Sequence, residues 1–253
     1  MGTPQTLASE AASKGWRPFG RTEDLELDFD TDDRPSLVTH LLSCCGELRE
    51  DQYWWSQTVG TRIAALLRLL AITDEINHLN LLGTCQESFC REKFEFELPL
   101  PFLIDFVPKT IIVQVKLNDT HVVSLRHPIG QDLRDWREQG LASREIAVAV
   151  MLKGLVVDGQ VTHEDESIIA EALSTMDPLV AFSVSCVCPT CSFSNEVSID
   201  LEDIALTRLK RRQLALLREI HELASHYGWT EAEVLAISPK RRARYLAMIE
   251  EKR

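Results

Sequence analysis

The sequence lacks the segments by which membrane and exported proteins are usually recognised. None of its apolar runs reaches the ~20 residues that a membrane-spanning helix needs. The first residues, MGTPQTLASEAASKGW, show no basic start followed by an apolar stretch, so we expect no secretion signal and a cytoplasmic location. In a reducing cytosol the seven cysteines are not expected to form disulfides, which leaves free thiols or metal ligands.

Recognised catalytic motifs are also missing. The sequence has no glycine-rich phosphate-binding loop, no nucleophile elbow and no His-Glu-x-x-His pair. These absences argue against the enzyme classes that such motifs define, and we expect a protein that is not an enzyme.

Positive charge is scarce, because the formal net charge is −12. A nucleic acid would be repelled by such a protein, so we do not expect a nucleic-acid partner. The charge is uneven, however. From Glu202 to the C-terminus, 11 Lys and Arg residues face 8 Asp and Glu residues, a net of +3, so the rest of the chain carries −15.

The first 84 residues are predicted to hold a tail and a helical segment. Residues 1–35 include RTEDLELDFDTDDRP, which has too few apolar residues to offset the entropy of ordering, so we expect an acidic disordered tail. Residues 36–84 contain SLVTHLLSCCGEL and TVGTRIAALLRLLAITDEI, whose apolar residues recur at helical spacing. The first of these helices is expected to bury Leu37, Leu41, Leu42, Cys45 and Leu48.

Residues 85–201 are predicted to form an α/β domain with inserted helices. KFEFELPL alternates apolar and acidic residues, which is typical of a half-buried strand, and TIIVQVKLNDTHVVSLRHP predicts a hairpin turning at Asn118 and Asp119. GQDLRDWREQG, SREIAVAVMLKGLV and THEDESIIAEALSTM are then expected to be helices. DPLVAFSVSC and EVSIDL are predicted to be the last two strands of this domain.

Residues 202–253 are predicted to form a C-terminal module of three helices. Gly228 is a natural terminator for the first helix, Thr230 and Glu233 form a capping box for the second, and Ser238 caps the third. The first helix carries an apolar stripe that we expect to be its packing face. The stripe consists of Leu206, Leu209, Leu214, Leu217, Ile220 and Ala224.

Two cysteine pairs each precede an alternating strand. Cys85 and Cys90 stand before KFEFEL, while Cys188 and Cys191, in CPTC, stand before EVSIDL. This is a weak internal repeat of a cysteine pair, a few turn residues and a strand. Two such turns facing each other bring four thiolates to one tetrahedral zinc ion. We therefore predict a structural zinc site formed by Cys85, Cys90, Cys188 and Cys191.

Other interpretations of the cysteines remain open from the sequence. Cys186 or a histidine could replace one ligand, or the thiols could be buried without a metal. A redox role for CPTC is weaker, because such motifs usually begin a helix, where the helix dipole lowers the thiol pKa, and here a strand is predicted to follow. A site closed by four cysteines stabilises a fold and leaves no position for chemistry.

The C-terminal text LLREIHELASHYGWTEAEVLAISPKRRARYLAMI closely resembles the signature of a known family. This is the baseplate hub assembly chaperone family of T-even-like contractile phage tails, which has relatives in bacterial contractile injection systems. The matching pieces are EIHELASHYGW, TEAEVLAI and RRARYL, and FEFELPLPFLID and VSLRHPIGQDLRDW resemble the family's central part. The resemblance covers residues 55–253. The chain departs from the family pattern in two ways. Four residues, and not two, separate Cys85 from Cys90, and Cys186 is an additional thiol.

The resemblance implies a non-enzymatic assembly factor or structural component of the baseplate hub of a contractile phage tail-like injection system. Its expected partners are hub, spike or tube proteins, and its expected location is the cytoplasm or the assembled particle. The expected fold class is α+β, with a split zinc-ribbon-like β core, inserted hairpin and helices, a helical N-terminal segment and a C-terminal three-helix module. The alternative is a zinc-ribbon nucleic-acid-binding or adaptor protein. A thiol redox enzyme is a further rival.

Overall fold

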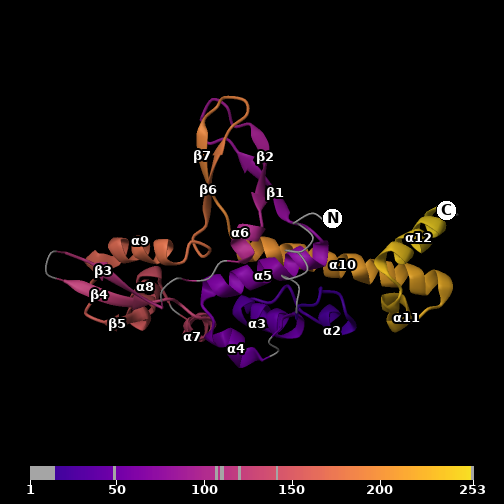
Figure 1. Ribbon diagram of the computed structural model, residues 1–253, viewed down its shortest axis with the longest axis horizontal. Helices are drawn as coiled ribbons and strands as arrows, with labels where there is room; N and C mark the ends of the chain where they lie inside the picture. Colours follow the sequence, from indigo (N-terminus) through magenta and orange to yellow (C-terminus); the bar gives the residue numbers. More distant parts are fainter. Residues whose placement is uncertain are drawn as a thin grey trace, which may run out of the picture.

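The computed structural model describes residues 15–251 apart from 48–49, 106–107, 109–110, 119–120 and 141. A helical body carries an upright arm of two β-hairpins, a small sheet unit at one end and a helical module at the other (Figure 1). The predicted mixed α+β class is confirmed. Within the described residues, no helix is both long enough and apolar enough to cross a membrane.

The body consists of helices around one hydrophobic core. Its helices are α3 (Arg34–Cys45), α4 (Asp51–Ser56), α5 (Val59–Asp74), the short α6 (Pro101–Ile104) and the first half of α10 (Leu201–Tyr227). The short α2 (Thr22–Leu25) lies beside this body, against α10 and α11. The Asp33 carboxylate accepts a hydrogen bond from Ser36 N at the start of α3, and the Thr58 hydroxyl accepts one from Thr61 N at the start of α5. Both helices therefore begin at a side chain that satisfies an otherwise unpaired backbone N–H.

A guanidinium group lies at the centre of this helical body. Arg62 on α5 is fully buried and donates to the Pro35 and Trp54 carbonyl oxygens, each at 2.8 Å, and to the Thr39 hydroxyl at 2.9 Å. α7 (Gly130–Glu138) starts against it, and a Cβ at Gly130 would lie 2.5 Å from Arg62 Nη1. Arg62 thus links α5 to α3, α4 and the start of α7.

The predicted disordered tail is wrong for the described part of that segment. Phe19 is buried in the body core, and the buried carboxylate of Asp24 pairs with both terminal nitrogens of Arg17, at 2.6 and 2.7 Å. Burial raises the pKa of Asp24, but hydrogen bonds from Arg17 and from backbone N–H groups lower it below its ordinary value. The acidic stretch is ordered because the chain supplies its cationic partners. Residues 1–14 lie outside the described residues.

The arm contains two antiparallel hairpins that stand on the body (Figure 1). Its strands are β1 (His78–Thr84), β2 (Lys93–Pro99), β6 (Ser183–Val187) and β7 (Ser194–Ser198), paired β1 with β2 and β6 with β7. Leu79 and Leu98 belong to the body core, whereas Phe94 packs in a separate small cluster at the far end. The prediction that residues 36–84 are helical is therefore wrong for 78–84, because pairing with β2 decides the conformation of this leucine-rich run.

The sheet unit is a separate element with its own core. It contains β3 (Ile112–Lys116), β4 (Val122–Arg126) and β5 (Val156–Asp158) in the order β3-β4-β5, with helices α8 (Arg144–Leu155) and α9 (Glu166–Met176). The predicted hairpin is confirmed as β3 and β4, and Asp119 of its turn lies outside the described residues. β5 was not predicted. The strands thus form three small sheets rather than one continuous core.

A buried carboxylate joins the sheet unit to the body. Asp177, directly after α9, accepts a hydrogen bond from Gly60 N at 2.9 Å, and its Oδ2 lies 3.9 Å from Nδ1 of buried His127. A Cβ at Gly60 would lie 1.9 Å from Asp177 Oδ1. A glycine in the first turn of α5 therefore permits this close approach.

The three predicted C-terminal helices are confirmed as α10, α11 (Glu231–Ala236) and α12 (Pro239–Glu250). Gly228 ends α10 in the left-handed conformation, and the predicted capping box forms, with Thr230 N donating to Glu233 Oε2 at 2.8 Å. Arg242 is buried on α12 and pairs with Glu219 at 2.9 Å. Glu219 of α10 thus provides the negative charge that compensates Arg242 in the first turn of α12.

The predicted apolar stripe of α10 is wrong at two positions. Leu214 and Leu217 are 42% and 39% exposed, whereas Leu216 and Leu223 are buried. The buried line runs through Gln213, whose amide donates to the carbonyl oxygens of the N-terminal segment at 2.9–3.2 Å. Because polar Gln213 is part of the packing face, the spacing of apolar residues alone placed that face incorrectly.

Replacing Arg62 with methionine should lower the free energy of unfolding by about 3–5 kcal/mol, because three buried acceptors lose their donor. Urea denaturation measures this change. Arg68→Met is the matched control in the same helix, because Arg68 contacts the exposed carboxylate of Asp105 and is itself partly exposed. That variant should lose less than about 1 kcal/mol. Equal losses in the two variants would contradict the central role of Arg62.

Candidate metal centre

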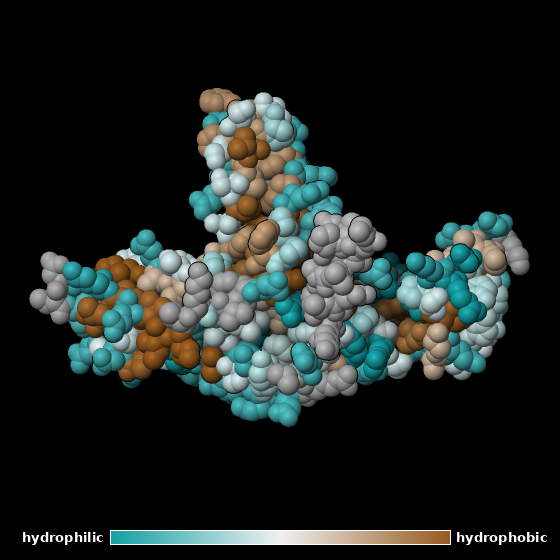
Figure 2. All heavy atoms as spheres, in the orientation of Figure 1, coloured by the Kyte–Doolittle hydropathy of each residue, from teal (hydrophilic) through white to brown (hydrophobic). Residues whose placement is uncertain are grey.

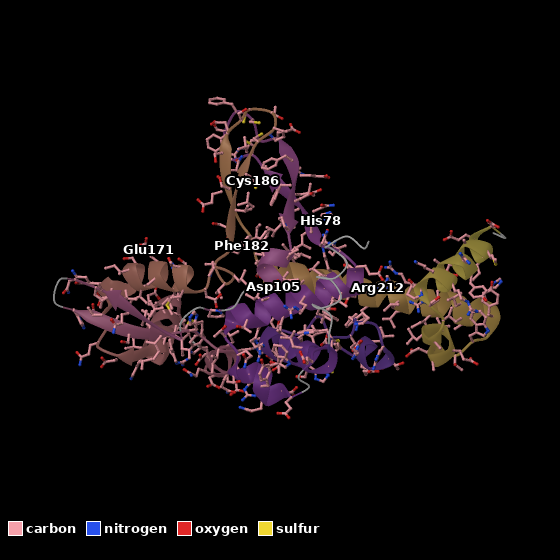
Figure 3. All side chains as sticks on the ribbon, in the orientation of Figure 1. His78, Asp105, Glu171, Phe182, Cys186 and Arg212 are labelled. Carbon is pink, nitrogen blue, oxygen red and sulfur yellow. The ribbon has the colours of Figure 1, made fainter. Side chains whose placement is uncertain are left out.

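The four predicted cysteines lie on the two hairpin turns at the far end of the arm. Cys85 and Cys90 are in the turn between β1 and β2, and Cys188 and Cys191 are in the turn between β6 and β7. Figure 3 shows the sulfur atoms gathered at that end. The two hairpins therefore bring together residues that are far apart in the sequence.

The sulfur atoms converge as the sequence predicts. Cys85 Sγ lies 3.5 Å from Cys191 Sγ, and Cys90 Sγ lies 3.8 Å from Cys188 Sγ. All four atoms lie within 4.8 Å of one another. A tetrahedral ion with bonds of about 2.3 Å to sulfur has edges of about 3.8 Å. The four cysteines can therefore hold one metal ion.

The two turns are built alike, although their lengths differ. Cys85 N donates to Glu92 O at 2.8 Å, and Cys188 N donates to Phe193 O at 2.9 Å. In each turn the residue after the second cysteine, Arg91 or Ser192, is in the left-handed conformation. The two extra residues between Cys85 and Cys90 are thus accommodated without changing how the turn closes.

Asn195 joins the two hairpins beside the sulfur atoms. Its side chain is fully buried, its Oδ1 accepts from Gln86 N at 2.7 Å and its amide donates to Phe193 O at 3.0 Å. A second link runs from the Gln86 side chain to Glu196 O at 2.9 Å. Asn195 was not among the site residues predicted from the sequence. The alternation of β7 could have indicated its burial, because Asn195 lies two residues before Val197 and therefore on the same, inward side of the strand.

The backbone favours deprotonation of one thiol in the group. Hydrogen bonds from the N–H groups of Cys191 and Thr190 lower the pKa of Cys188 to about 7, although burial opposes this effect. Burial raises the pKa of Cys85. Four thiolates at these distances would repel one another strongly unless a cation lay between them. The electrostatics of the arm therefore fit a bound cation.

The remaining thiols lie outside the group. Cys186 is on β6 and packs against the small cluster of Phe94, but the group of converging sulfur atoms does not include it. Cys45 is in the body core, where burial raises its pKa to about 12, and its neighbour Cys44 is half-buried. No histidine of the described chain belongs to the group. The geometry thus favours the four predicted ligands over substitution by Cys186 or histidine.

Comparisons with known proteins returned no match to a family model, to a curated protein or to a solved structure. The interpretation of this centre therefore depends on its geometry and on the chemistry of sulfur ligands.

Replacing Cys191 with serine should abolish or strongly weaken metal binding, because it removes one of the four ligands. Cys191 is exposed, so the substitution leaves no cavity in the fold. Titration of the reduced protein with Co²⁺ measures binding through the thiolate-to-cobalt absorption bands. Cys186→Ser is the matched control and should still bind one equivalent. Loss of binding in Cys186→Ser, with retention in Cys191→Ser, would show that the ligand set is wrong.

Proposed function

We propose that the metal is Zn²⁺ and that the arm is a split, zinc-ribbon-like element. Tetrahedral sites made only of cysteine sulfur select zinc or iron, and structural zinc sites commonly pair two cysteine-bearing turns. Cys85 and Cys188 are buried beside Phe94 in a cluster that holds few other buried residues. So small a core gives the arm little stability of its own, and a metal ion joining the two hairpins would supply it.

We also propose that the protein is not an enzyme. Four cysteine ligands fill the tetrahedral sphere, which leaves no position where water or a substrate could bind the ion. The metal would then hold the ends of the hairpins together and take no part in a reaction.

The proposed biological role is assembly of the baseplate hub of a contractile phage tail-like particle, as an assembly factor or as a component of the hub. The observation that carries this proposal is the sequence resemblance around HYGWTEAEVLAI. These residues belong to a compact module in which Tyr227 stacks on Trp229 with ring centroids 4.6 Å apart, and Tyr245 of α12 packs edge-on at 5.2 Å from Trp229. The residues of the resemblance thus position α12 on the end of α10.

The arrangement of the molecule suits a protein that binds others. The arm, the sheet unit and the C-terminal module extend in different directions from one body (Figure 1). Hub, spike or tube proteins could contact the projections separately. A nucleic-acid partner is less suited to the arm, because the exposed strand positions Glu95, Glu97 and Glu196 carry negative charge.

Protein purified without added metal should contain one zinc ion per chain, as measured by elemental analysis of the purified sample. A zinc-loaded centre is colourless, whereas four thiolates around iron absorb visible light. One iron per chain, or no metal in a sample that was kept reduced throughout, would contradict the zinc proposal.

Replacing Trp229 with alanine in the native cell should prevent normal particle assembly, because the ring contacts of Trp229 with Tyr227 of α10 and Tyr245 of α12 are lost. Electron microscopy of particles and mass spectrometry of their baseplate proteins measure the outcome. Leu82→Ser is the control, because Leu82 is exposed on the side of the arm. Normal particles from both Trp229→Ala and a complete deletion of the protein would sink the assembly proposal.

A further inference from the structure

Helix α8 in the sheet unit is apolar on almost every side, yet the chain leaves much of it uncovered. Its sequence between the end charges is IAVAVML, and only Leu152 and Leu155 are buried in the helix. Ile146 is 50% exposed. A helix with apolar residues all round is normally enclosed by protein. Figure 2 shows hydrophobic residues gathered over this end of the molecule, where Figure 1 places α8 and the sheet.

One face of α8 lines an open groove of about 550 Å³. Val148, Ala149 and Leu152 form the apolar wall, and Glu145 and Lys153 stand at its two ends. The facing wall comes from the segment between β5 and α9, which includes Val161 and Thr162. The α8 wall of the groove thus has an apolar middle with one acidic and one basic residue at its ends, while His163 and Glu166 belong to the facing wall.

The charges on this face are self-complementary. Glu145 and Lys153 lie four residues before and four residues after Ala149, and both side chains are exposed. If a second α8 packs antiparallel with its Ala149 opposite the first, each Glu145 meets the Lys153 of the other copy. The small side chain of Ala149 at the centre lets the two helices approach closely.

We propose that two copies of the chain form a two-fold symmetric dimer through antiparallel packing of their α8 helices. Two-fold pairing is the commonest symmetry of soluble oligomers and requires a surface that complements itself. A partner with a surface of one charge sign would leave Glu145 or Lys153 facing a like charge. The inference goes beyond the proposed function, because it uses neither the cysteines nor the C-terminal helices.

Charge reversal in the full metal-loaded chain tests the dimer. Light scattering or sedimentation of the wild-type protein should give twice the mass of one chain. Glu145→Lys and Lys153→Glu should each raise the dimer dissociation constant about tenfold or more, because each variant places two pairs of like charges together. An equimolar mixture of the two variants should restore the dimer, because both pairs then join opposite charges.

Glu171→Lys is the matched control, because Glu171 is exposed on α9 (labelled in Figure 3) and does not line the groove. This variant should dimerise as tightly as the wild type. Circular dichroism should show the same helix content in all variants. A wild-type protein that stays monomeric at all concentrations would overturn the proposal. So would reversed variants that dimerise normally, or a mixture that does not recover.

Discussion

The buried guanidinium of Arg62 is the interaction on which the arrangement of the whole molecule depends. It satisfies carbonyl oxygens near the start of α3 and the end of α4, and it lies against the first residue of α7. Burial lowers its pKa to about 10, so the group stays charged at neutral pH. The arm, the sheet unit and the C-terminal module all extend from the helices that Arg62 holds together. The arm begins with β1 directly after α5, and α7 leads toward the sheet unit. The C-terminal module continues from α10, which packs on α5.

The cysteine group imposes a second constraint, because it closes a long stretch of chain. Cys90 and Cys188 are 98 positions apart, and the whole sheet unit lies between them. Ordering so long a loop costs entropy that the small core of the arm can offset only in part. Hydrogen bonds through Asn195 align the hairpins, and sulfur ligands around a common ion would fix their ends. The arm therefore has a small core of its own and, at its far end, four cysteines that could hold a metal ion.

Opposite charges within the chain also decide which segments are ordered. The acidic N-terminal segment lies against α10, where Asp30 pairs with Lys210 and Gln213 donates to three of its backbone carbonyl oxygens. Farther along, Arg34 pairs with Asp200 and Glu202 at the start of α10. The acidic N-terminal segment thus lies against the more basic C-terminal part of the same chain. Each therefore neutralises part of the other's charge, and less of that charge is left to attract a partner.

The sequence by itself determined the features that depend on near neighbours. Spacing predicted the four converging cysteines, and alternation predicted β2. Turn residues predicted the hairpin of β3 and β4, and Gly228 and the Thr230 capping box predicted the end of α10 and the start of α11. Ser238 precedes α12 as predicted, but its side chain makes no capping hydrogen bond. Three features were decided only by the tertiary structure. Asp24 pairs with Arg17 in an ordered N-terminal segment, and residues 78–84 pair with β2 as a strand. Gln213, and not a leucine, lies in the packing face of α10. The physical reason is that caps and periodicity are written into a few adjacent residues, whereas a buried ion pair or a strand partner depends on residues that the fold brings together from far along the chain.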